Sequence, residues 1–335
     1  MPHPTKNLVP VPDYRRTASR RTFSELPAVL RDRLAAHAGG SIASVHNAGG
    51  GFTNGFAAVL TSDTGARIFA KAAPAADSLI YPAYEREAQV VPLLPEGMPV
   101  PRLHFAEHHV VNGVDWQLLV YEAIEGRMPG QPWSEADLCS VEAACAAAAG
   151  MPGFPAGMAG DPLAEDMALV PSQFVPVADG GAAPWFLPEL NAAQARLFQA
   201  SLDLCPEALA GDAVLHGDLR PDNILISSGR ALFCDWNFLG TGAPWTDWVG
   251  VLPYARGGGL DADAWLQRSA LTRDVPPAYI DAWLAALLNY MIHAGSQPEV
   301  AASPHLRSHG RYTARLVRDW LDSRQATIGG GPPRP

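Results

Sequence analysis

The sequence predicts an α+β fold in which a small sheet carrying one helix is joined to a larger, mainly helical part. Two observations support this division. Residues 42–122 contain short apolar runs separated by turn residues, a pattern typical of strands. From about residue 127 the pattern becomes helical, beginning with an alanine-rich segment. At 335 residues the chain can bury a sizeable core and form one large or two smaller domains.

The strand-rich part divides into three segments. Residues 41–73, SIASVHNAGGGFTNGFAAVLTSDTGARIFAKAA, hold three short apolar runs separated by a glycine-rich turn and an Asp-Thr-Gly turn. A helix is expected around residues 82–94, PAYEREAQVVPLL. Residues 103–122, LHFAEHHVVNGVDWQLLVYE, then read as a hairpin with Asn112-Gly113 at its turn.

The helical part begins with a capping signal. Ser134 is a candidate N-cap with Asp137 three residues later, so we expect a helix from there to about residue 149. Residues 151–188, rich in proline and glycine, predict a long loop or insertion. Further helices are expected near residues 190–209, 262–270, 277–293 and 306–324, followed by a disordered tail, TIGGGPPRP.

Composition and charge narrow the class of protein. The chain is 48% hydrophobic and 17% charged, with mean hydropathy near zero, as in soluble globular proteins. A net charge of −10 argues against nucleic acid as a partner. The absence of a signal-peptide core or a membrane-length apolar run predicts a cytoplasmic protein without a membrane partner. The cysteines show neither C-x-x-C nor zinc-ligand spacing, which favours free thiols: Cys139, Cys145, Cys205 and Cys234.

Residues 215–236, LHGDLRPDNILISSGRALFCDW, contain the strongest chemical signal. Two apolar runs flank the turn SSGR and predict a tight hairpin, which returns Asp235 to the side of Asn223. An amide oxygen and a carboxylate are hard ligands suited to Mg²⁺. Asp218 lies five residues before Asn223, within reach of the same point, where it would accept the proton of an attacking hydroxyl. The alternative for these acids is a polar loop in which they only cap turns.

The segments HGDLRPDN and CDW resemble the catalytic and metal-binding segments of the aminoglycoside phosphotransferase and choline kinase group. The resemblance implies a protein-kinase-like bilobal fold, with a small antiparallel-sheet N-lobe carrying one helix and a larger helical C-lobe. Protein kinases have arginine after this histidine and D-F-G at the metal aspartate. This chain has Gly217 and DWN, which favours a small-molecule kinase. The resemblance covers residues 45–255 by the order of the motifs.

An enzyme of this kind needs a strand lysine paired with a helix glutamate to hold the nucleotide phosphates. Of the 24 Lys and Arg residues only two are lysines, and Lys71 is the one outside the N-terminal tail. Its partner is Glu85 or Glu87, and the REA pattern favours Glu87. The alternative for Lys71 is an exposed residue at a strand end.

The resemblance assigns the remaining nucleotide contacts and the lobe boundaries. The turn GGGFTNGF would cover the phosphates, and the backbone of LLVYEAIEG would bind the adenine edge at a hinge. The residues concerned are Gly50, Gly51, Phe52, Thr53, Asn54, Glu122, Ala123 and Ile124. The divisions are 1–22 (N-terminal tail), 23–122 (N-lobe), 123–126 (hinge), 127–325 (C-lobe) and 326–335 (disordered tail).

His216 and Asp247 are expected to brace the catalytic loop rather than take part in the chemistry. The acceptor is expected between that loop and the helices of the C-lobe, where the available acids include Asp179. The candidate contacts are Glu165, Asp166, Trp185 and Asp261. Many acids there would suit a polyamine sugar, whereas Trp185 and Phe186 would suit an apolar or nucleoside-like acceptor.

The leading hypothesis is a Mg²⁺-dependent kinase that transfers phosphate from ATP or GTP to a hydroxyl of an antibiotic, aminoglycoside-like or other. The second is a metabolic kinase of the same fold acting on choline, a sugar or an amino-alcohol. The third is an inactive, kinase-like binding module. The sequence leaves the acceptor, the choice of ATP or GTP, and the oligomeric state open.

Overall fold

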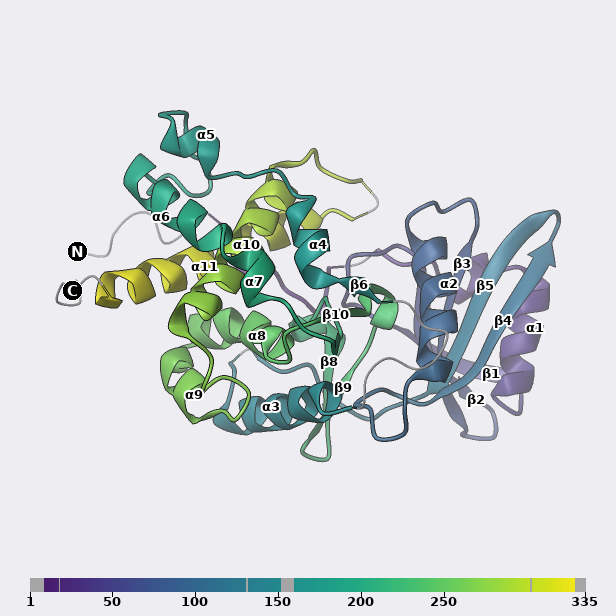
Figure 1. Ribbon diagram of the computed structural model, residues 1–335. Helices are drawn as coiled ribbons and strands as arrows, with labels where there is room; N and C mark the ends of the chain where they lie inside the picture. The colour runs from purple at the N-terminus through teal and green to yellow at the C-terminus, as the bar shows by residue number, and fades with distance from the viewer. Residues whose placement is uncertain (1–8, 18, 131, 152–159, 302, 329–335) are drawn as a thin grey trace.

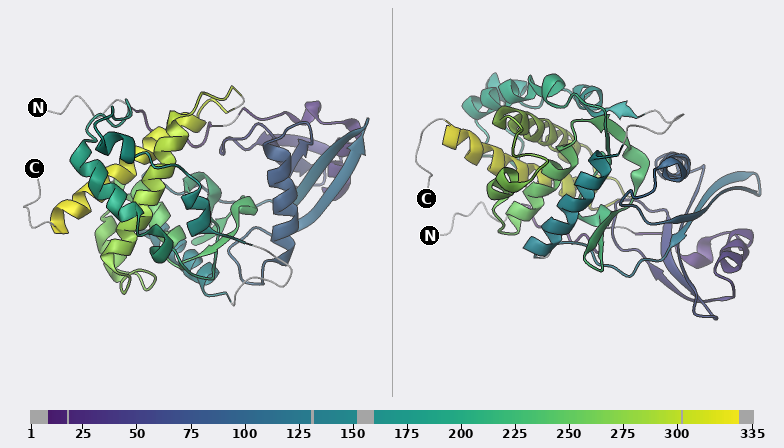
Figure 2. Two further views of the ribbon diagram at one scale, coloured as in Figure 1. Left: turned by 45° about the horizontal axis from the view of Figure 1, so that its top comes forward. Right: turned by 60° about the horizontal axis from the view of Figure 1, so that its bottom comes forward.

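The computed structural model describes residues 9–17, 19–130, 132–151, 160–301 and 303–328. A strand-rich part and a helical part lie side by side along the molecule (Figure 1), and two further views show the same division (Figure 2). The α+β fold predicted from the sequence, with a small antiparallel sheet and a larger helical part, is confirmed. Within these residues no helix is long and apolar enough to cross a membrane.

The smaller part is built on a five-stranded antiparallel sheet with strand order β1-β2-β3-β5-β4. Its strands are β1 (Ile42–Asn47), β2 (Phe56–Ser62), β3 (Arg67–Pro74), β4 (Leu103–Val111) and β5 (Val114–Glu122). Asn112 and Gly113 join β4 to β5 with φ of 53° and 77°, the left-handed conformation that a two-residue hairpin turn requires. This turn was predicted from the Asn-Gly pair.

Two helices cover opposite faces of the sheet, α1 (Ala28–His37) and α2 (Ile80–Val90). Successive residues of a strand point to opposite faces, and β5 shows the consequence. Leu118 and Val120 belong to the apolar cluster that contains α1. Leu119 and Tyr121 belong to the cluster that contains α2 and continues into the helical part. The α2 face is therefore the one that meets the rest of the molecule.

The larger part combines helices with short strands. The helices are α3 (Glu135–Ala149), α4 (Leu163–Ala168), α5 (Val175–Ala178), α6 (Ala192–Leu202), α7 (Cys205–Ala208), α8 (Thr246–Gly257), α9 (Ala262–Arg268), α10 (Pro277–Ser296) and α11 (Leu306–Ile328). The strands are β6 (Asp161–Pro162), β7 (Ala213–Leu215), β8 (Ile224–Ser227), β9 (Arg230–Phe233) and β10 (Gly240–Gly242). β6, β10 and β7 form one small sheet, and β8 pairs with β9.

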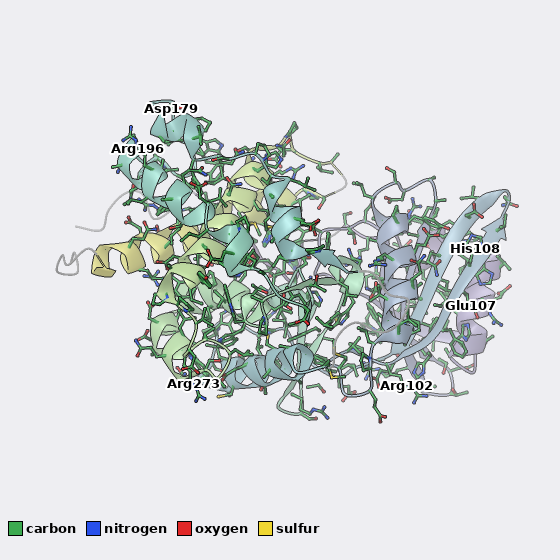
Figure 3. All side chains as sticks on the ribbon, in the orientation of Figure 1. Arg102, Glu107, His108, Asp179, Arg196 and Arg273 are labelled. Carbon is green, nitrogen blue, oxygen red and sulfur yellow. The ribbon has the colours of Figure 1, made fainter. Side chains whose placement is uncertain are left out.

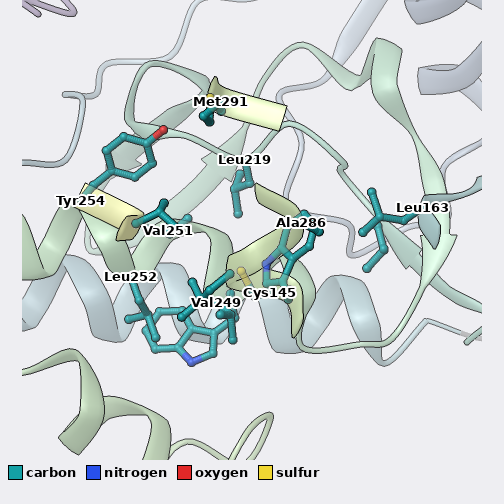
Figure 4. Packing of buried hydrophobic residues seen from close by; sticks show 14 of the residues in the cluster. Cys145, Leu163, Leu219, Val249, Val251, Leu252, Tyr254, Ala286 and Met291 are labelled. Carbon is teal, nitrogen blue, oxygen red and sulfur yellow. The ribbon is translucent and has the colours of Figure 1, made fainter. Parts of the chain in front are cut away.

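The core of the larger part lies under α8 and α10, helices that are apolar on most sides. In α8, Val249, Val251 and Leu252 are completely buried. They pack with Cys145 of α3 and Ala286 of α10 (Figure 4). A helix that is apolar on most sides must be covered on all of them, and α3, α9 and α11 supply that cover. Helices α8 and α10 are therefore held firmly in the core of the larger part.

The Ser134 cap was predicted correctly, because its side chain accepts from the N–H of Asp137 and α3 runs to Ala149. The long loop predicted over residues 151–188 was wrong in part. Its described residues contain β6, α4 and α5, which the proline and glycine content concealed. Asp179 follows α5 at the end of the helical part farthest from the sheet (Figure 3). Cys145 and Cys205 are buried free thiols as expected, whereas Cys139 is exposed.

Both chain ends differ from the expected tails. In residues 9–17 the side chains of Tyr14 and Thr17 are buried, so this segment packs against the molecule rather than leading in from solvent. At the other end α11 continues to Ile328, and the remainder of the predicted tail lies outside the described residues. The sequence hid both features because the nearby prolines, arginines and glycines are typical of disordered ends.

A charged cluster fastens α1 to the outermost strand. Glu107 of β4 (Figure 3) accepts hydrogen bonds from Arg33 Nε and Nη2 at 2.8 and 2.6 Å. It also contacts Nε2 of His37 at 3.1 Å and of His109 at 2.9 Å. The hydrogen bonds from Arg33 outweigh burial and lower the pKa of Glu107 to about 2. The carboxylate is therefore ionised at neutral pH.

We expect Glu107→Gln to lower the free energy of unfolding at pH 7. The pKa of Glu107 falls from 4.5 to about 2 on folding, so its contribution is present above pH 4.5 and is lost as the pH drops toward 2. The difference between the variant and the wild type should therefore shrink over that interval in urea unfolding curves. Glu96→Gln, at an exposed position, is the matched control. A difference that does not depend on pH would contradict the assignment.

Candidate active site

The loop after β7 is held in place by a partly buried aspartate and a buried histidine. Asp247, in the first turn of α8, accepts from the backbone N–H of His216 at 2.6 Å and of Gly217 at 3.2 Å. His216 Nε2 contacts the carbonyl of Cys234 at 2.7 Å. Burial lowers the pKa of His216, so the ring is neutral and its Nε2–H donates. Its Nδ1 is then free to accept the N–H of Asp218 at 3.3 Å.

Asp218 projects from this loop with its carboxylate about one-quarter exposed. Arg220 donates to its Oδ2, and Asn223 Nδ2 donates to the same oxygen at 3.2 Å and to the Asp218 carbonyl at 2.9 Å. Burial raises the pKa of Asp218, and Arg220 opposes that rise. A carboxylate with a raised pKa is a better proton acceptor while it remains ionised.

The hairpin formed by β8 and β9 brings Asn223 and Asp235 together. Ile224 of β8 is paired with Phe233 of β9, and the N–H of Cys234 donates to the carbonyl of Asn223 at 2.8 Å. Asn223 and Asp235 therefore stand next to each other at the open end of the hairpin. Because Asn223 uses its amide nitrogen toward Asp218, its oxygen is the atom left for a ligand.

An amide oxygen beside a carboxylate fits Mg²⁺, which is usually held by one or two protein oxygens together with phosphate and water. Within the described part of the chain there is no group of three or more His, Cys, Asp or Glu side chains that could form an all-protein metal cage. The hard oxygens of Asn223 and Asp235 could take part in holding such an ion.

Lys71 links the sheet to this hairpin. Its ammonium donates to Glu87 Oε1 and Oε2 at 2.8 and 2.7 Å and also to Asp235. Glu87 is held in turn by the hydroxyl of Tyr121 at 2.8 Å. Burial acts against the Lys71 ammonium, but the carboxylates of Asp235 and Glu87 more than offset it and raise its pKa. Burial likewise opposes ionisation of Asp235, yet Lys71 lowers its pKa to about 2.

A cavity of about 480 Å³ opens above this pair, between the sheet and the catalytic loop. Of the expected nucleotide contacts, seven line it: Lys71, Glu87, Gly50, Gly51, Thr53, Glu122 and Ile124. Phe52, Asn54 and Ala123 are not part of its lining. Phe52 is turned away and packs against His309, with ring centroids 4.9 Å apart. The carbonyl of Asn54 is taken by the N–H of Arg21.

The cavity is also lined by residues that were not predicted from the sequence. Arg15 and Arg20 line it, although residues 1–22 were predicted to form an N-terminal tail. Asp222 lines it as well, with its Oδ1 bound to Arg220 Nε at 2.8 Å. The Asp222 side chain is completely buried, and its Oδ2 has no partner among the described residues.

A second cavity, of about 340 Å³, opens on the other side of the catalytic loop. Gly217, Asp218 and Arg220 form one wall, and most of the remaining lining is apolar or aromatic. Those side chains are Leu163, Met167, Val170, Leu215, Leu219, Phe238, Tyr254, Trp283, Leu287, Tyr290 and Met291. Leu163, Leu219, Tyr254 and Met291 also belong to the buried cluster in Figure 4.

Of the four expected acceptor contacts, only Asp166 lines this cavity. The other three are placed elsewhere, each for a local reason. Asp261 caps α9 by accepting from the N–H of Ala264 at 3.0 Å. Trp185 is exposed and lies against Phe186 and the guanidinium of Arg311. Glu165 is exposed on α4. No sequence signal had separated Asp166 from its neighbour.

The sequence of residues 44–291 matches the model of the phosphotransferase enzyme family. The chain belongs to this family. The resemblance inferred from HGDLRPDN and CDW is therefore confirmed, and the chain is a phosphotransferase that acts on a hydroxyl group of a small molecule. No curated protein matches the sequence closely enough to narrow the activity further.

Solved structures of the family share the fold. A thermostable mutant of an aminoglycoside phosphotransferase, in complex with AMP-PNP and hygromycin B, is 14% identical with a TM-score of 0.57; the match covers 91% of this chain and 100% of that one. An aminoglycoside phosphotransferase from Alicyclobacillus acidocaldarius is 16% identical, with a TM-score of 0.52 and coverage of 94% and 99%. A macrolide 2′-phosphotransferase from Brachybacterium faecium is 16% identical, with a TM-score of 0.51 and coverage of 88% and 97%.

We expect Gly217→Ala to disable the catalytic loop. Gly217 has φ +78°, and a Cβ there would lie 2.3 Å from the carbonyl oxygen of Phe238, so the loop must shift. A shift of about 1 Å in the position of a catalytic group costs about a hundredfold in turnover. Gly65→Ala is the matched control, because Gly65 has φ +84° with nothing within 4 Å of the added carbon. Phosphate-transfer assays on the two variants should diverge, and equal loss in both would contradict this account.

Proposed function

We propose that this phosphotransferase is a Mg²⁺-dependent kinase that transfers the γ-phosphate of ATP or GTP to a hydroxyl of an antibiotic with a largely apolar body. One observation carries the proposal. Asp218 and Arg220 line the apolar cavity, while Asp222 and Asp235, on either side of Asn223, line the cavity that contains Lys71. A donor in one cavity and an acceptor in the other would meet at Asp218.

The side chains around the two cavities supply each step of the proposed transfer. Asp218 accepts the proton of the acceptor hydroxyl while the oxygen of that hydroxyl forms a bond to the γ-phosphorus. At the same time the bond between the γ-phosphorus and the bridging oxygen breaks, and the nucleoside diphosphate leaves. Lys71, fixed by Glu87, binds the phosphate oxygens. Asn223 and Asp235 would hold Mg²⁺, which neutralises the phosphate charge when bound. His216 and Asp247 keep the loop in register. We propose a cytoplasmic location, because ATP and GTP would be the phosphate donors.

The lining of the second cavity favours an apolar acceptor over a polyamine sugar. Three carboxylates line it, those of Asp166, Asp218 and Asp247. Two of these carboxylates already have a role in the catalytic loop, because Asp247 accepts from backbone N–H groups and Asp218 is the proposed base. A ligand with several ammonium groups would therefore find few partners, whereas aromatic and aliphatic walls suit a large apolar ring. The structural neighbours include a macrolide 2′-phosphotransferase as well as aminoglycoside phosphotransferases, so this choice of acceptor rests on the lining of the cavity.

A second candidate, a metabolic kinase for an amino-alcohol such as choline, rests on the aromatic side chains of the same cavity. Phe238, Tyr254, Trp283 and Tyr290 line it, and aromatic faces bind quaternary ammonium groups. A substrate panel separates the two candidates. Macrolide-type, aminoglycoside and choline acceptors are compared by nucleoside diphosphate release, and by growth of a sensitive bacterium that expresses the chain.

We expect Asp218→Asn to reduce turnover by about 10²- to 10⁴-fold, the usual contribution of a general base. Asparagine keeps the shape of the side chain, so nucleotide binding should be retained. The measurement is steady-state nucleoside diphosphate release together with nucleotide titration. Asp212→Asn, at an exposed position directly before β7, is the control. Turnover unchanged in Asp218→Asn would remove this residue from its role.

We expect Leu287→Ala to raise KM for the acceptor several-fold and to leave KM for the nucleotide unchanged. Leu287 lines the apolar cavity only, and removing its side chain takes away buried contact with an apolar ligand. Leu197→Ala, at an exposed position on α6, serves as the control. An equal change in both KM values would contradict the division of the site into two cavities.

A further inference from the structure

The glycine-rich loop, residues 48–55, is bound along its length by the segment that precedes α1. This segment, residues 13–17 and 19–21, is called the lead-in below. Its backbone N–H groups donate to the loop at two places, Thr17 to the carbonyl of Gly49 at 3.0 Å and Arg21 to the carbonyl of Asn54 at 3.1 Å. The hydroxyl of Thr17 donates to the carbonyl of Gly51. The two segments are thus laced together by backbone groups.

The side chain of Arg20 binds three more carbonyl groups of the glycine-rich loop. Its Nε donates to the carbonyl of Ala48 at 2.8 Å and its Nη2 to that of Gly50 at 2.6 Å. Its Nη1 reaches the hydroxyl of Thr53 at 3.2 Å and the carbonyl of Gly55 at 3.5 Å. A guanidinium presents five donors in a fixed fork, which is why a single side chain can hold four points of one loop.

The far side of the loop is tied to the larger part of the molecule. Ser303 donates its hydroxyl to the carbonyl of Phe52. Tyr14, in the lead-in, bonds to His309 Nδ1 at 2.8 Å and lies edge-on to Phe52, with ring centroids 6.3 Å apart. The lead-in is therefore anchored to α11 as well as to the loop, and it has a firm base from which to hold it.

The consequence is a loop in which seven of the eight carbonyl oxygens accept hydrogen bonds. Carbonyls of residues 48–52, 54 and 55 accept the bonds described above. Within the described residues, no acceptor is found for the backbone N–H groups of residues 49–55. Successive free N–H groups in a glycine turn form a concave site for an anion. The carbonyl oxygens, which would repel phosphate, already accept from Thr17, Arg20, Arg21 and Ser303.

Gly49 is an independent sign that this arrangement is specific. A Cβ at Gly49 would lie 1.9 Å from the carbonyl oxygen of Arg15, so only glycine admits the lead-in at this distance. Arg15 and Arg20 both line the same cavity as Lys71. The lead-in thus contributes two cations to a cavity whose strand lysine is already shared between two carboxylates.

We propose that the lead-in is part of the nucleotide site, with Arg20 as the residue that holds the glycine-rich loop in its phosphate-binding form. This inference rests on the proposed function, because it takes the phosphates of ATP or GTP to be the ligand of the loop. Arg20 orients the loop by binding its carbonyls, and its charge adds to that of Lys71. The lead-in therefore takes part in nucleotide binding by holding the glycine-rich loop in place.

The test compares a nucleotide with the nucleoside that lacks its phosphates. Binding of ATP, adenosine, GTP and guanosine to the full-length chain is measured by calorimetry for the wild type, Arg20→Gln, Arg20→Lys and Thr17→Val. For the nucleotide that the wild type binds, Arg20→Gln should raise Kd about 10- to 100-fold, the usual effect of losing hydrogen bonds from a charged group. The Kd of the matching nucleoside should stay within about twofold. Arg20→Lys should fall in between, and Thr17→Val should show a smaller rise.

Arg16→Gln is the matched control, since Arg16 is an exposed arginine of the same segment, and it should leave every Kd unchanged. Equal binding of ATP or GTP by the wild type and Arg20→Gln would overturn the inference and leave the proposed function standing. A rise in Kd for nucleoside and nucleotide alike would overturn it too, because that shows a general loss of structure. If Arg20→Gln does not fold, as judged by its thermal transition, Thr17→Val decides. A wild type that binds neither nucleotide overturns the proposed function and this inference together.

Discussion

The buried ammonium of Lys71 is the interaction on which the rest of the site depends. It joins three elements that are distant in sequence, β3 through its own backbone, α2 through Glu87, and the catalytic hairpin through Asp235. A charge out of water is costly unless it is paired, and breaking such a pair by removing one partner costs about 3–5 kcal/mol. Three charged groups that satisfy one another therefore fix the distance between the sheet and the catalytic loop.

That distance sets up two cavities with different chemistry on either side of one loop. The cavity above Lys71 is lined by Arg15, Arg20 and the glycine-rich loop, which suit an anion with many oxygens. The cavity beyond Asp218 has walls that are mostly aromatic and aliphatic. Asp218 stands at the boundary, where burial raises its pKa while Arg220 keeps it from rising further. In the proposed function, both the position of this carboxylate and its ability to accept a proton are needed for phosphate transfer.

The lead-in addresses a cost that every glycine-rich phosphate loop carries. Glycine loses more conformational freedom on ordering than any other residue, so a loop that is ordered only when the ligand arrives weakens binding. Here the carbonyls of the loop are bound in advance by Thr17 and Arg20. The ordering is then part of folding, and the nucleotide does not have to supply it.

The sequence by itself determined the local parts of this protein. The Asn112-Gly113 turn, the Ser134 cap and the hairpin after Asn223 depend on backbone preferences of a few adjacent residues, and each could be predicted. The order of HGDLRPDN and CDW was enough for the family, and Lys71 stood out because the chain otherwise uses arginine. The helices hidden in residues 151–188 were missed, because they are short and their stability comes from packing rather than from propensity.

Only the tertiary structure decided which side chains share a cavity. Asp166 lines the cavity beyond Asp218 while Asp261 caps a helix, although the two look alike in sequence. Arg20 resembled a solvated tail residue until the fold placed it against the glycine-rich loop, some 30 residues later in the chain. The physical reason is the range of the forces involved. Turns and caps are fixed within four residues, whereas a cavity wall is assembled from segments that only the burial of the core brings together.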